Sequence, residues 1–433
     1  MLLIYTANNT NRFSYIAEVL FWQVYKIDFT ITQNKEELLQ YEGAKINYSG
    51  TPVCAKEIWI QPHDLLLQQN IQPQNIECFN WNGIKAFFKT VGDIPFDIFA
   101  ASFYLISRYE EYLPHETDEY GRYAHANSMA FKEGFLHVPL VNLWMKELVK
   151  IIHSKYSSFT FHLPPFTFTP TYDVDIAYAY KGKGFLRNAG GFYKELFTGK
   201  FKQLAERSNV TSGWQKDPFD TYEWIDSLHE KYHLKPIYFF LLAERARMYD
   251  KNISPHSRIM QRLIKQHALK YTTGIHPSWQ SSDDEGIFKK EISLLKSITG
   301  KEVKCSRQHY IRMSLPQTYR LLLENCIEAD YTMGYGSING FRASVASPFY
   351  WFDIELDVKT GLFIYPYCYM EANSYFEQHY TAEQAAVELQ QYLNRVKSVG
   401  GQLITIFHNH FITEQPEWLP WRNMYAGFLQ NNF

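Results

Sequence analysis

Two aspartates separated by one residue are the first candidates for chemistry in this chain. The segment Thr171-Tyr172-Asp173-Val174-Asp175 lies at the end of a run rich in β-branched and aromatic residues. In an extended strand, residues i and i+2 face the same side, so both carboxylates would point into one space. Such a pair either shares a cation or splits its pKa values, one carboxylate remaining ionised and the other acting as a base. The alternative is a strand end whose aspartates satisfy local backbone groups.

Three histidine-containing segments supply further candidates. His276 follows a β-rich run and precedes a proline, which would hold it rigidly at a strand end, and imidazole is the commonest metal ligand. The segment 307–310, Arg-Gln-His-Tyr, carries an arginine that could fix a carboxylate through a bidentate pair. His408 and His410 alternate on an apolar strand and would face one side, as ligand and general acid. Each could instead be structural, as a hydrogen-bonded histidine or a surface ion pair.

Strands alternating with helices must position these candidates. Alternation of this kind predicts a parallel sheet or a barrel, in which chemistry sits at the C-terminal ends of the strands. A clear helix should follow Thr381, where the sequence TAEQ forms a capping box, and should end near Gly400. The expected strands lie within residues 166–180, 235–243, 271–279, 303–310, 340–344 and 402–411.

A proline-rich segment divides the chain of 433 residues, which is too long for one compact core. Residues 161–170 contain three prolines, so we expect a smaller α/β N-terminal domain over residues 1–165 and a second domain over residues 166–433. Residues 181–220 are interpreted as an insertion that could shape a substrate groove or a lid. The N-terminal domain is expected to contain strands in residues 2–7, 44–50 and 56–62 and an apolar helix in residues 96–113.

Composition excludes some partners and indicates a compartment. The formal charge of −2 gives no electrostatic case for a nucleic acid or an anionic membrane as main partner. No apolar run is long enough for a membrane span or a signal peptide, and the five scattered cysteines lack metal or disulfide spacing. We therefore expect a cytoplasmic protein with reduced thiols. The aromatic fraction of 17% fits a large core, a sugar-binding cleft, or both. Nothing indicates an oligomeric state.

The ordered motifs resemble those of the polysaccharide deacetylase superfamily, the NodB-homology or carbohydrate esterase family 4-like proteins. That family has an Asp-rich first strand, a histidine motif, an arginine motif and a late strand ending in histidine, and residues 236–240 resemble its second strand. The similarity is greatest to bacterial two-domain members, which share a run like residues 107–144 and whose N-terminal domain has no assigned role. The resemblance implies a distorted (β/α) barrel of the NodB-homology type in the C-terminal domain.

The resemblance also implies catalytic roles. Asp173 corresponds to the base that activates water, and Arg307 to the arginine that holds this base. Tyr310 lies where a backbone N–H helps an oxyanion, and His408 matches the histidine that protonates the departing amine. The implied reaction is metal-dependent hydrolysis of a carbon–nitrogen bond.

The implied metal site departs from the family pattern. By resemblance, Asp175 and His276 bind a divalent cation, zinc first, with cobalt, nickel or manganese as alternatives. The family has a second histidine four residues after the first, but here that position is Gln280. The third ligand stays open among His309, His410 and Gln280.

The expected activity is N-deacetylation of an amino sugar in a glycan or its precursor. A different reading is a carbohydrate-binding or scaffold protein with impaired catalysis, which the glutamine at position 280 favours. A third is a hydrolase of a small non-sugar amide. Candidate substrate-binding residues are Trp279, Asp250, Asn252 and Arg342. The alternative for Asp250 and Asn252 is a plain turn, and the alternative for Arg342 is packing in the core.

Overall fold

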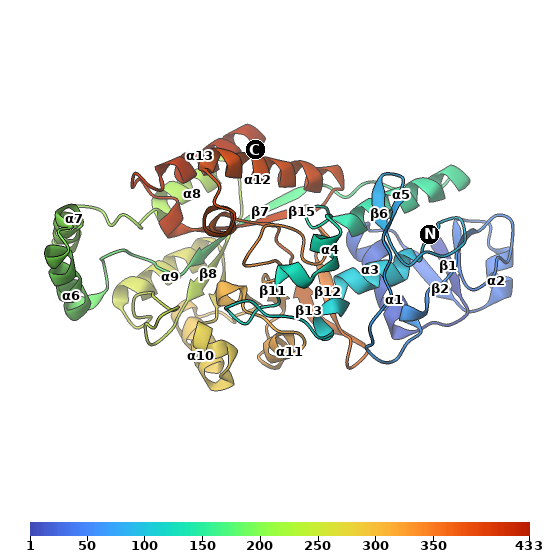
Figure 1. Cartoon of the computed structure of the whole chain (residues 1–433), viewed down its shortest axis with the longest axis horizontal. Helices are drawn as coiled ribbons and strands as arrows, with labels where there is room; N and C mark the ends of the chain where they lie inside the picture. Colours follow the sequence, from blue (N-terminus) through green and yellow to red (C-terminus); the bar gives the residue numbers. More distant parts are fainter.

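The computed structural model describes every residue from Met1 to Phe433 and shows an elongated molecule (Figure 1). The N-terminal part lies at one end of the long axis. Two helices, α6 (Gly184–Phe197) and α7 (Phe201–Thr211), project at the opposite end, and a large sheet with its covering helices occupies the middle. The residues interpreted as an insertion therefore form a helical hairpin.

A small parallel sheet forms the base of the N-terminal part, with strand order β2-β1-β3-β4. The second strand in this order has the sequence LLIYT and is buried along its whole length, as expected for a strand covered on both faces. The strands expected from the first 62 residues are confirmed. The elements of this part are β1 (Leu2–Thr6), α1 (Asn11–Ala17), β2 (Phe29–Thr32), α2 (Lys35–Gln40), β3 (Lys45–Tyr48), β4 (Ile58–Ile60), β5 (Phe79–Trp81), β6 (Ile84–Ala86), α3 (Ile98–Ile106), α4 (Met129–Lys132) and α5 (Leu140–Lys155).

Helix α3 is the apolar helix expected within residues 96–113, but it is shorter than that run. The side chain of Asp97 caps its start by accepting hydrogen bonds from the backbone N–H groups of Phe99 and Ala100. Every residue of the helix is buried. The helix ends before Arg108, whose positive φ of 56° turns the chain toward the second part of the molecule.

The second part is built on a nine-stranded sheet whose order is β12-β13-β11-β10-β9-β8-β7-β15-β14. All neighbouring strands are parallel except the antiparallel pair β12 and β13, which confirms the expected parallel sheet. The strands are β7 (Thr167–Val174), β8 (Ile237–Leu241), β9 (Thr272–His276), β10 (Cys305–Ser306), β11 (Ala329–Asp330), β12 (Phe349–Asp353), β13 (Val358–Ile364), β14 (Tyr369–Met370) and β15 (Gln402–His408).

This sheet curls strongly. Only residues 365–368 separate β13 from β14; β13 pairs with β11 through Phe363 and Ile364, and β14 pairs with β15. One continuous piece of chain therefore contributes strands near both ends of the strand order, so the two ends of the sheet approach each other. Side chains from β8, β10, β14 and β15, and from Tyr331 just after β11, also meet in a single buried cluster, which a flat sheet of this width could not allow. The cluster consists of Ile237, Phe239, Cys305, Ile311, Tyr331, Tyr367, Met370, Ile404 and Ile406.

Helices cover the outer face of this sheet, and α12 and α13 pack side by side along one edge of the molecule (Figure 1). The capping box at Thr381 and Gln384 is confirmed at the start of α12. Gly400 has a φ of 62° just after this helix, and an added Cβ there would lie 2.0 Å from the carbonyl oxygen of Pro164. No helix combines the length and the apolar composition that crossing a membrane requires. The remaining helices are α8 (Tyr222–Lys231), α9 (Arg258–Lys270), α10 (Glu285–Thr299), α11 (Gln317–Glu324), α12 (Ala382–Ser398) and α13 (Leu419–Asn432).

The prediction of a strand in residues 340–344 is wrong. This segment forms turns, and the next strand, β12, begins only at Phe349. Gly340 has a φ of 152° and Ser344 a φ of 51°, and the second value lies in the left-handed region, which an extended strand does not use. The apolar composition of the run reflects burial rather than strand pairing.

The two parts of the chain share one apolar core. The hydroxyl of Tyr15, in α1, donates to the carbonyl oxygen of Tyr350 in β12 at 2.7 Å. Arg12 pairs with Asp357 in the β12–β13 turn at 3.2 Å, and the rings of Phe103 and Phe352 lie 5.4 Å apart. The β12–β13 hairpin thus fastens the large sheet to the N-terminal part.

Candidate active site

Strand β7 carries Asp173 to the C-terminal edge of the large sheet, and Asp175 follows directly. In the ladder, Asp173 is level with Phe239 of β8 and His408 of β15, so three neighbouring strands end together. Oδ1 of Asp173 accepts a hydrogen bond from Nη1 of Arg307 at 2.8 Å. Because both side chains are buried, this charge-assisted bond forms in a low dielectric, where it is strong.

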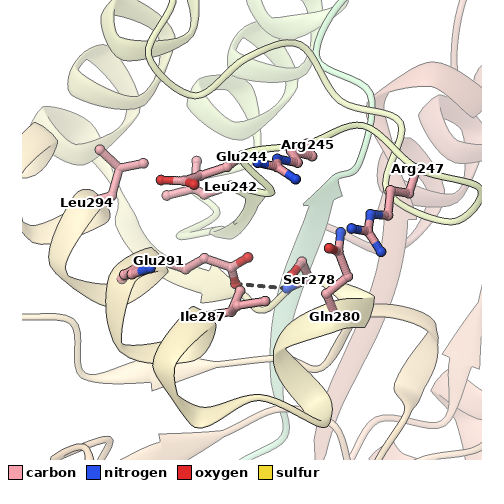
Figure 2. Close-up of a pocket in the computed structure, with 10 residues that line it drawn as sticks. Leu242, Glu244, Arg245, Arg247, Ser278, Gln280, Ile287, Glu291 and Leu294 are labelled. Carbon is pink, nitrogen blue, oxygen red and sulfur yellow. Dashed lines mark hydrogen bonds between the residues drawn. The ribbon is translucent and has the colours of Figure 1, made fainter.

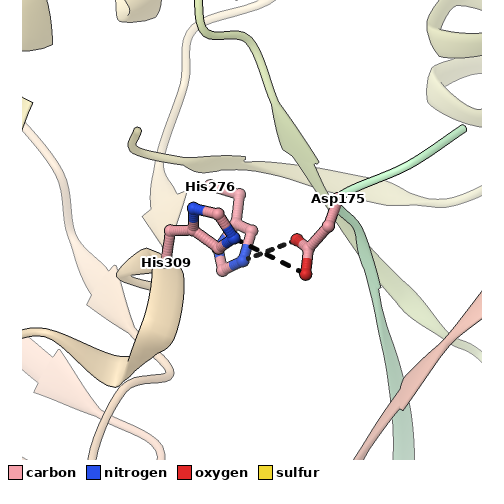
Figure 3. Close-up of side chains that lie close together, drawn as sticks. All are labelled: Asp175, His276 and His309. Atoms are coloured by element: carbon pink, nitrogen blue, oxygen red, sulfur yellow. Dashed lines mark ion pairs between the residues drawn. The ribbon is translucent and has the colours of Figure 1, made fainter. Parts of the chain in front are cut away.

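Asp175, His276 and His309 form a compact group of possible metal ligands (Figure 3). One ligand atom from each residue lies within 4.8 Å of the others. Nε2 of His276 is 3.1 Å from Oδ1 of Asp175, and Nε2 of His309 is 3.6 Å from Oδ2. The three side chains come from the ends of β7 and β9 and from the turn after β10, which the curled sheet brings together.

Hydrogen bonds behind this group determine which histidine nitrogens face Asp175. Nδ1 of His276 contacts the carbonyl oxygen of Arg307, and Nδ1 of His309 lies 3.1 Å from Oδ1 of Asp250. A proton on each Nδ1 leaves each Nε2 free as an electron-pair donor toward Asp175. Oδ1 of Asp175 is itself buried without a hydrogen-bond partner of suitable geometry. Two imidazole nitrogens and an unsatisfied carboxylate oxygen fit a divalent cation such as zinc.

Charge pairing dominates the electrostatics of this group. Burial opposes the ionised form of Asp175, but His309 and His276 hold the pKa of this carboxyl well below its usual range. Burial likewise opposes protonation of His309, yet Asp175 and Asp250 raise its pKa to about 9. The group therefore has a strong preference for positive charge beside Asp175.

His408 also lies beside Asp175, with its Nε2 3.4 Å from Oδ2 of that carboxylate. Its Nδ1 is 2.9 Å from Oε1 of Glu371, which also accepts the backbone N–H of His408. Burial opposes the charged ring, but Glu371 and Asp175 raise the pKa of His408 to about 10. In His410, burial and the neighbouring His408 lower the pKa to about 3. His408 is therefore built to carry a proton, and His410 is neutral.

These residues line a pocket of about 480 Å³. Its wall includes Asp173, Asp175, His276, His309 and His408 together with aromatic side chains. The pocket thus combines a group of acidic and imidazole side chains with aromatic rings and further polar residues, a mixture found in many ligand sites. The aromatic lining residues are Tyr120, Tyr249, Tyr310, Phe376 and Phe411.

The N-terminal part contributes to this pocket. Tyr120 and Arg122 both line it, and Nη1 of Arg122 donates to the carbonyl oxygen of Tyr310 at 2.9 Å. Tyr310 and Ile311 have φ values of 58° and 56°, which are uncommon for residues with a Cβ. Asp118 holds the guanidinium of Arg122 at 2.6 Å. The turn that carries His309 is thus clamped from outside the large sheet, as expected for a strained segment at a functional site.

Two residues expected to bind substrate have buried structural contacts instead. Asp250 accepts from the backbone N–H of Trp279 at 2.9 Å and holds His309, and it does not line the pocket. The amide of Asn252 donates to the carbonyl oxygens of Val174 and Leu241. Asp250 therefore orients a histidine, and Asn252 joins the ends of β7 and β8.

The other two expected substrate contacts also lie outside the pocket lining. The ring of Trp279 stacks on Tyr249 with centroids 4.2 Å apart, so it supports a lining residue from behind. Arg342 is 1% exposed and pairs with Glu111 at 2.6 Å. The arginine expected beside sugar-binding aromatics therefore joins the two parts of the chain.

Gln280 lies in a neighbouring pocket of about 220 Å³ rather than beside the two imidazoles (Figure 2). Its Nε2 is 3.3 Å from Oδ2 of Asp250. In the same pocket the backbone N–H of Ser278 donates to Oε2 of Glu291 at 3.0 Å, and burial raises the pKa of Glu291 to about 7. Of the three candidates for a third ligand, the structure places His309 in the group with Asp175 and His276.

Sequence reasoning missed two residues of the pocket wall and Glu371, which holds His408. Glu371 gave one weak signal, an acidic residue directly after an apolar run that forms β14. Tyr120 and Arg122 lie within residues 107–144, the run shared with the two-domain proteins, but that run has no assigned role and did not point to the pocket. Only the three-dimensional structure brings them to Tyr310.

Comparisons with known proteins give one family match and several similar solved structures. Residues 2–157 match a family of unknown function, DUF7033. No curated protein matches the chain. Among solved structures, the chain resembles a protein from Mycobacterium smegmatis assigned as a polysaccharide deacetylase, with 14% identity and a TM-score of 0.40 over 63% of this chain and 86% of that one.

Two further solved structures are similar at the same level. Puue allantoinase has 10% identity and a TM-score of 0.39 over 61% of this chain and 83% of that one. A mutant of a CE4 family pseudoenzyme with restored enzymatic activity has 11% identity and a TM-score of 0.30 over 62% of this chain and 65% of that one. The scores are low, so the chemistry has to be argued from the residues of the pocket.

Proposed function

We propose that the protein is a metal-dependent hydrolase of carbon–nitrogen bonds that removes the acetyl group from an N-acetylated amino sugar in a glycan or its precursor. The observation that carries this proposal is the convergence of three kinds of group on one pocket. Two imidazoles face the unsatisfied carboxylate oxygen of Asp175. Arg307 holds the carboxylate of Asp173, and Glu371 holds the protonated His408. The order of these motifs along the chain also resembles that of polysaccharide deacetylases.

Asp175, His276 and His309 would hold the cation. Their mixed nitrogen and oxygen donors suit zinc, with cobalt, nickel or manganese as alternatives. When bound, the cation would supply Lewis-acid polarisation of the acetamide carbonyl and of water. Asp250 and the carbonyl oxygen of Arg307 keep the two imidazoles oriented for this role.

Asp173 is the proposed general base. Arg307 fixes its carboxylate through Oδ1, which leaves Oδ2 to take a proton from the attacking water. Because both side chains are buried, Arg307 holds the carboxylate of Asp173 in one orientation. The backbone N–H of Tyr310 is proposed as a donor to the oxyanion that forms on the carbonyl oxygen.

His408 is the proposed general acid. Glu371 accepts from its Nδ1 and stabilises the imidazolium, and its Nε2 lies 3.4 Å from Oδ2 of Asp175. A proton on Nε2 can therefore pass to the nitrogen of the departing amine as the amide bond breaks. Asp173 and His408 lie level on adjacent strands, so water activation and amine protonation occur on one substrate.

The pocket wall supports a sugar as the group that carries the amide. Tyr310, Phe376 and Phe411 offer apolar ring faces beside the polar cluster. Tyr120 and Arg122 add a polar rim from the N-terminal part. A small non-sugar amide would use the same polar cluster and leave most of these rings without contact.

The remaining assignments belong to the same proposal. We assign residues 1–165 to an N-terminal α/β domain and residues 166–433 to a distorted (β/α) barrel, supported by the segment 358–370 that pairs with both β11 and β15. A cytoplasmic location is supported by five cysteines that form no disulfide.

Release of acetate from acetylated amino-sugar oligomers tests the function. We expect the zinc-loaded protein to release acetate, and His276→Ala to lose both zinc and activity. Activity on small amides but not on acetylated sugars would instead support a hydrolase of a small non-sugar amide.

A carbohydrate-binding or scaffold role is the alternative, and the glutamine at position 280 favours it. This alternative predicts binding of amino-sugar oligomers without zinc uptake. Metal analysis of the purified protein therefore separates the two: close to one zinc per chain supports the hydrolase, and no zinc under replete conditions supports the binding protein.

A further inference from the structure

The helical hairpin formed by α6 and α7 presents an apolar face to solvent. None of the residues of α6 is buried. Phe185, Leu186 and Phe197 are 85%, 85% and 84% exposed, and Trp214 after α7 is 87% exposed. Large apolar side chains this exposed, gathered in one helical hairpin, mark an interaction surface. The other exposed apolar residues of the hairpin are Phe192, Tyr193, Leu196 and Phe201.

The two helices pack through their polar faces, which leaves the apolar stripe outside. Arg207 of α7 forms an ion pair with Glu195 of α6 at 2.6 Å and a hydrogen bond with Asn188 at 2.9 Å. The guanidinium of Arg207 also lies directly against Gly191 of α6. The apolar side chains of α6 recur three or four residues apart on the other face, the spacing of an amphipathic helix. A helix whose polar face is turned inward and whose apolar face is turned outward needs a partner.

The charge of this segment indicates which partner. Residues 181–216 contain eight lysines and arginines and two glutamates, a formal charge of +6, although the whole chain carries −2. Basic residues flanking an outward face of Phe, Leu and Trp are the pattern of helices that lie in the interface of an anionic bilayer. The net charge of the whole chain is therefore close to zero, although the end of the molecule formed by this hairpin is strongly basic. A symmetric contact with a second copy would bring +6 against +6 and is disfavoured.

We propose that the α6–α7 hairpin docks this protein onto the surface of an anionic lipid bilayer, with the stripe of Phe185, Leu186, Tyr193 and Phe197 inserted among the lipids. The hairpin lies at the far end of the molecule from the N-terminal part, so nothing else in the chain obstructs its approach (Figure 1). Arg187 binds the carbonyl oxygen of Asn252 at 3.2 Å, next to Lys251 on the pocket wall. Docking would thus hold the pocket beside the membrane surface.

Flotation with lipid vesicles tests the proposal, and it requires no enzymatic activity. The full chain is mixed with vesicles of phosphatidylcholine alone or of phosphatidylcholine with phosphatidylglycerol. We expect binding to the second kind and little to the first, with the bound fraction falling as salt is added. Failure to bind either kind would overturn the proposal while leaving the proposed hydrolase untouched.

Two sets of substitutions separate the apolar contribution to vesicle binding from the electrostatic one. The variant Phe185→Ser with Leu186→Ser and Phe197→Ser should bind at least about a hundred-fold more weakly, because three inserted side chains are lost. The variant Lys194→Glu with Lys200→Glu and Lys202→Glu should bind more weakly by about ten-fold or more. These side chains are exposed, so circular dichroism should show unchanged folding.

Control substitutions define what would contradict docking. Leu269→Ser removes a side chain that is 84% exposed on α9, and it should leave vesicle binding unchanged. Binding by the three-serine variant that equals the wild type would overturn the proposal. Self-association of the wild type without lipid, abolished in the three-serine variant, would show that a second copy covers this face, and would overturn it as well.

Discussion

Nη1 of Arg307 lies 2.8 Å from Oδ1 of Asp173, although their strands, β10 and β7, are separated by β9 and β8. In a flat sheet, three interstrand spacings of about 4.8 Å would place these strands about 14 Å apart. The contact therefore depends on the curl of the sheet. It fixes the carboxylate of Asp173, the proposed base, at the pocket wall.

Asp173→Asn keeps the size of the side chain and removes its basicity. We expect kcat for acetate release to fall by about 10²–10⁴-fold, the usual contribution of a general base. Zinc content should stay at the wild-type level, because Asp173 lies outside the proposed ligand set. Loss of zinc together with activity would mean that Asp173 is a ligand.

Asp250→Ala removes the acceptor that orients His309. We expect zinc affinity to fall by about 10–100-fold, as is typical when a residue behind a histidine ligand is lost. Titration of zinc into the metal-depleted protein measures this directly. Asp283→Ala, an exposed carboxylate that pairs with Arg312, is the matched control and should bind zinc as the wild type does. Equal affinity in both variants would remove His309 from the ligand set.

Arg122→Ala releases the clamp on the strained turn at Tyr310. Because a residue in this backbone region costs about 1–3 kcal/mol, the turn should relax when the hydrogen bond is lost. We expect kcat/KM to fall by about ten-fold or more, with zinc content unchanged. Lys85→Ala, which removes an exposed charge from the same part of the chain, should leave kcat/KM unaltered. A wild-type rate for Arg122→Ala would show that the N-terminal part has no influence on the pocket.

Glu111→Gln tests the ion pairs that join the two parts of the chain. Burial opposes the charge of Glu111, but Arg342 and Arg108 lower its pKa from 4.5 to about 2. A depressed pKa stabilises the folded state above the unfolded value, and this stability is lost as the pH falls from 4.5 toward 2. We expect the variant to be less stable by about 3 kcal/mol at neutral pH.

Urea denaturation at several pH values measures this effect. The difference between the wild type and Glu111→Gln should shrink steadily below pH 4.5, since the wild-type carboxyl then becomes protonated as well. Glu133→Gln, an exposed residue paired with Lys85, should cost less than about 1 kcal/mol at any pH. A constant difference across the whole range would mean that the charge of Glu111 is not the cause.

Local spacing was sufficient to predict part of the molecule. Alternation in β7 correctly gave the two aspartates a common edge, and the Thr381 capping box predicted the start of α12. Both are properties of a few consecutive residues. The parallel sheet followed from the alternation of strands and helices.

Other features depend on contacts that no local pattern records. Arg342 seemed suited to a sugar site because aromatic residues surround it, but it pairs with Glu111, 231 positions away. Glu371 follows a strand of only two residues, too short for periodicity. His309, rather than His410 or Gln280, joins Asp175 and His276 because of how the turn after β10 is placed in space, and the spacing of these residues in the sequence gives no sign of it.

The central claim is that this pocket hydrolyses an amide with the help of a cation bound by Asp175, His276 and His309. The most direct measurement is acetate release from acetylated amino-sugar oligomers before metal removal, after treatment with a chelator, and after zinc is added back. We predict activity, its loss, and its recovery at one zinc per chain, with no recovery in His309→Ala. Acetate release that persists without metal, or its absence in the protein fully loaded with zinc, would contradict the claim.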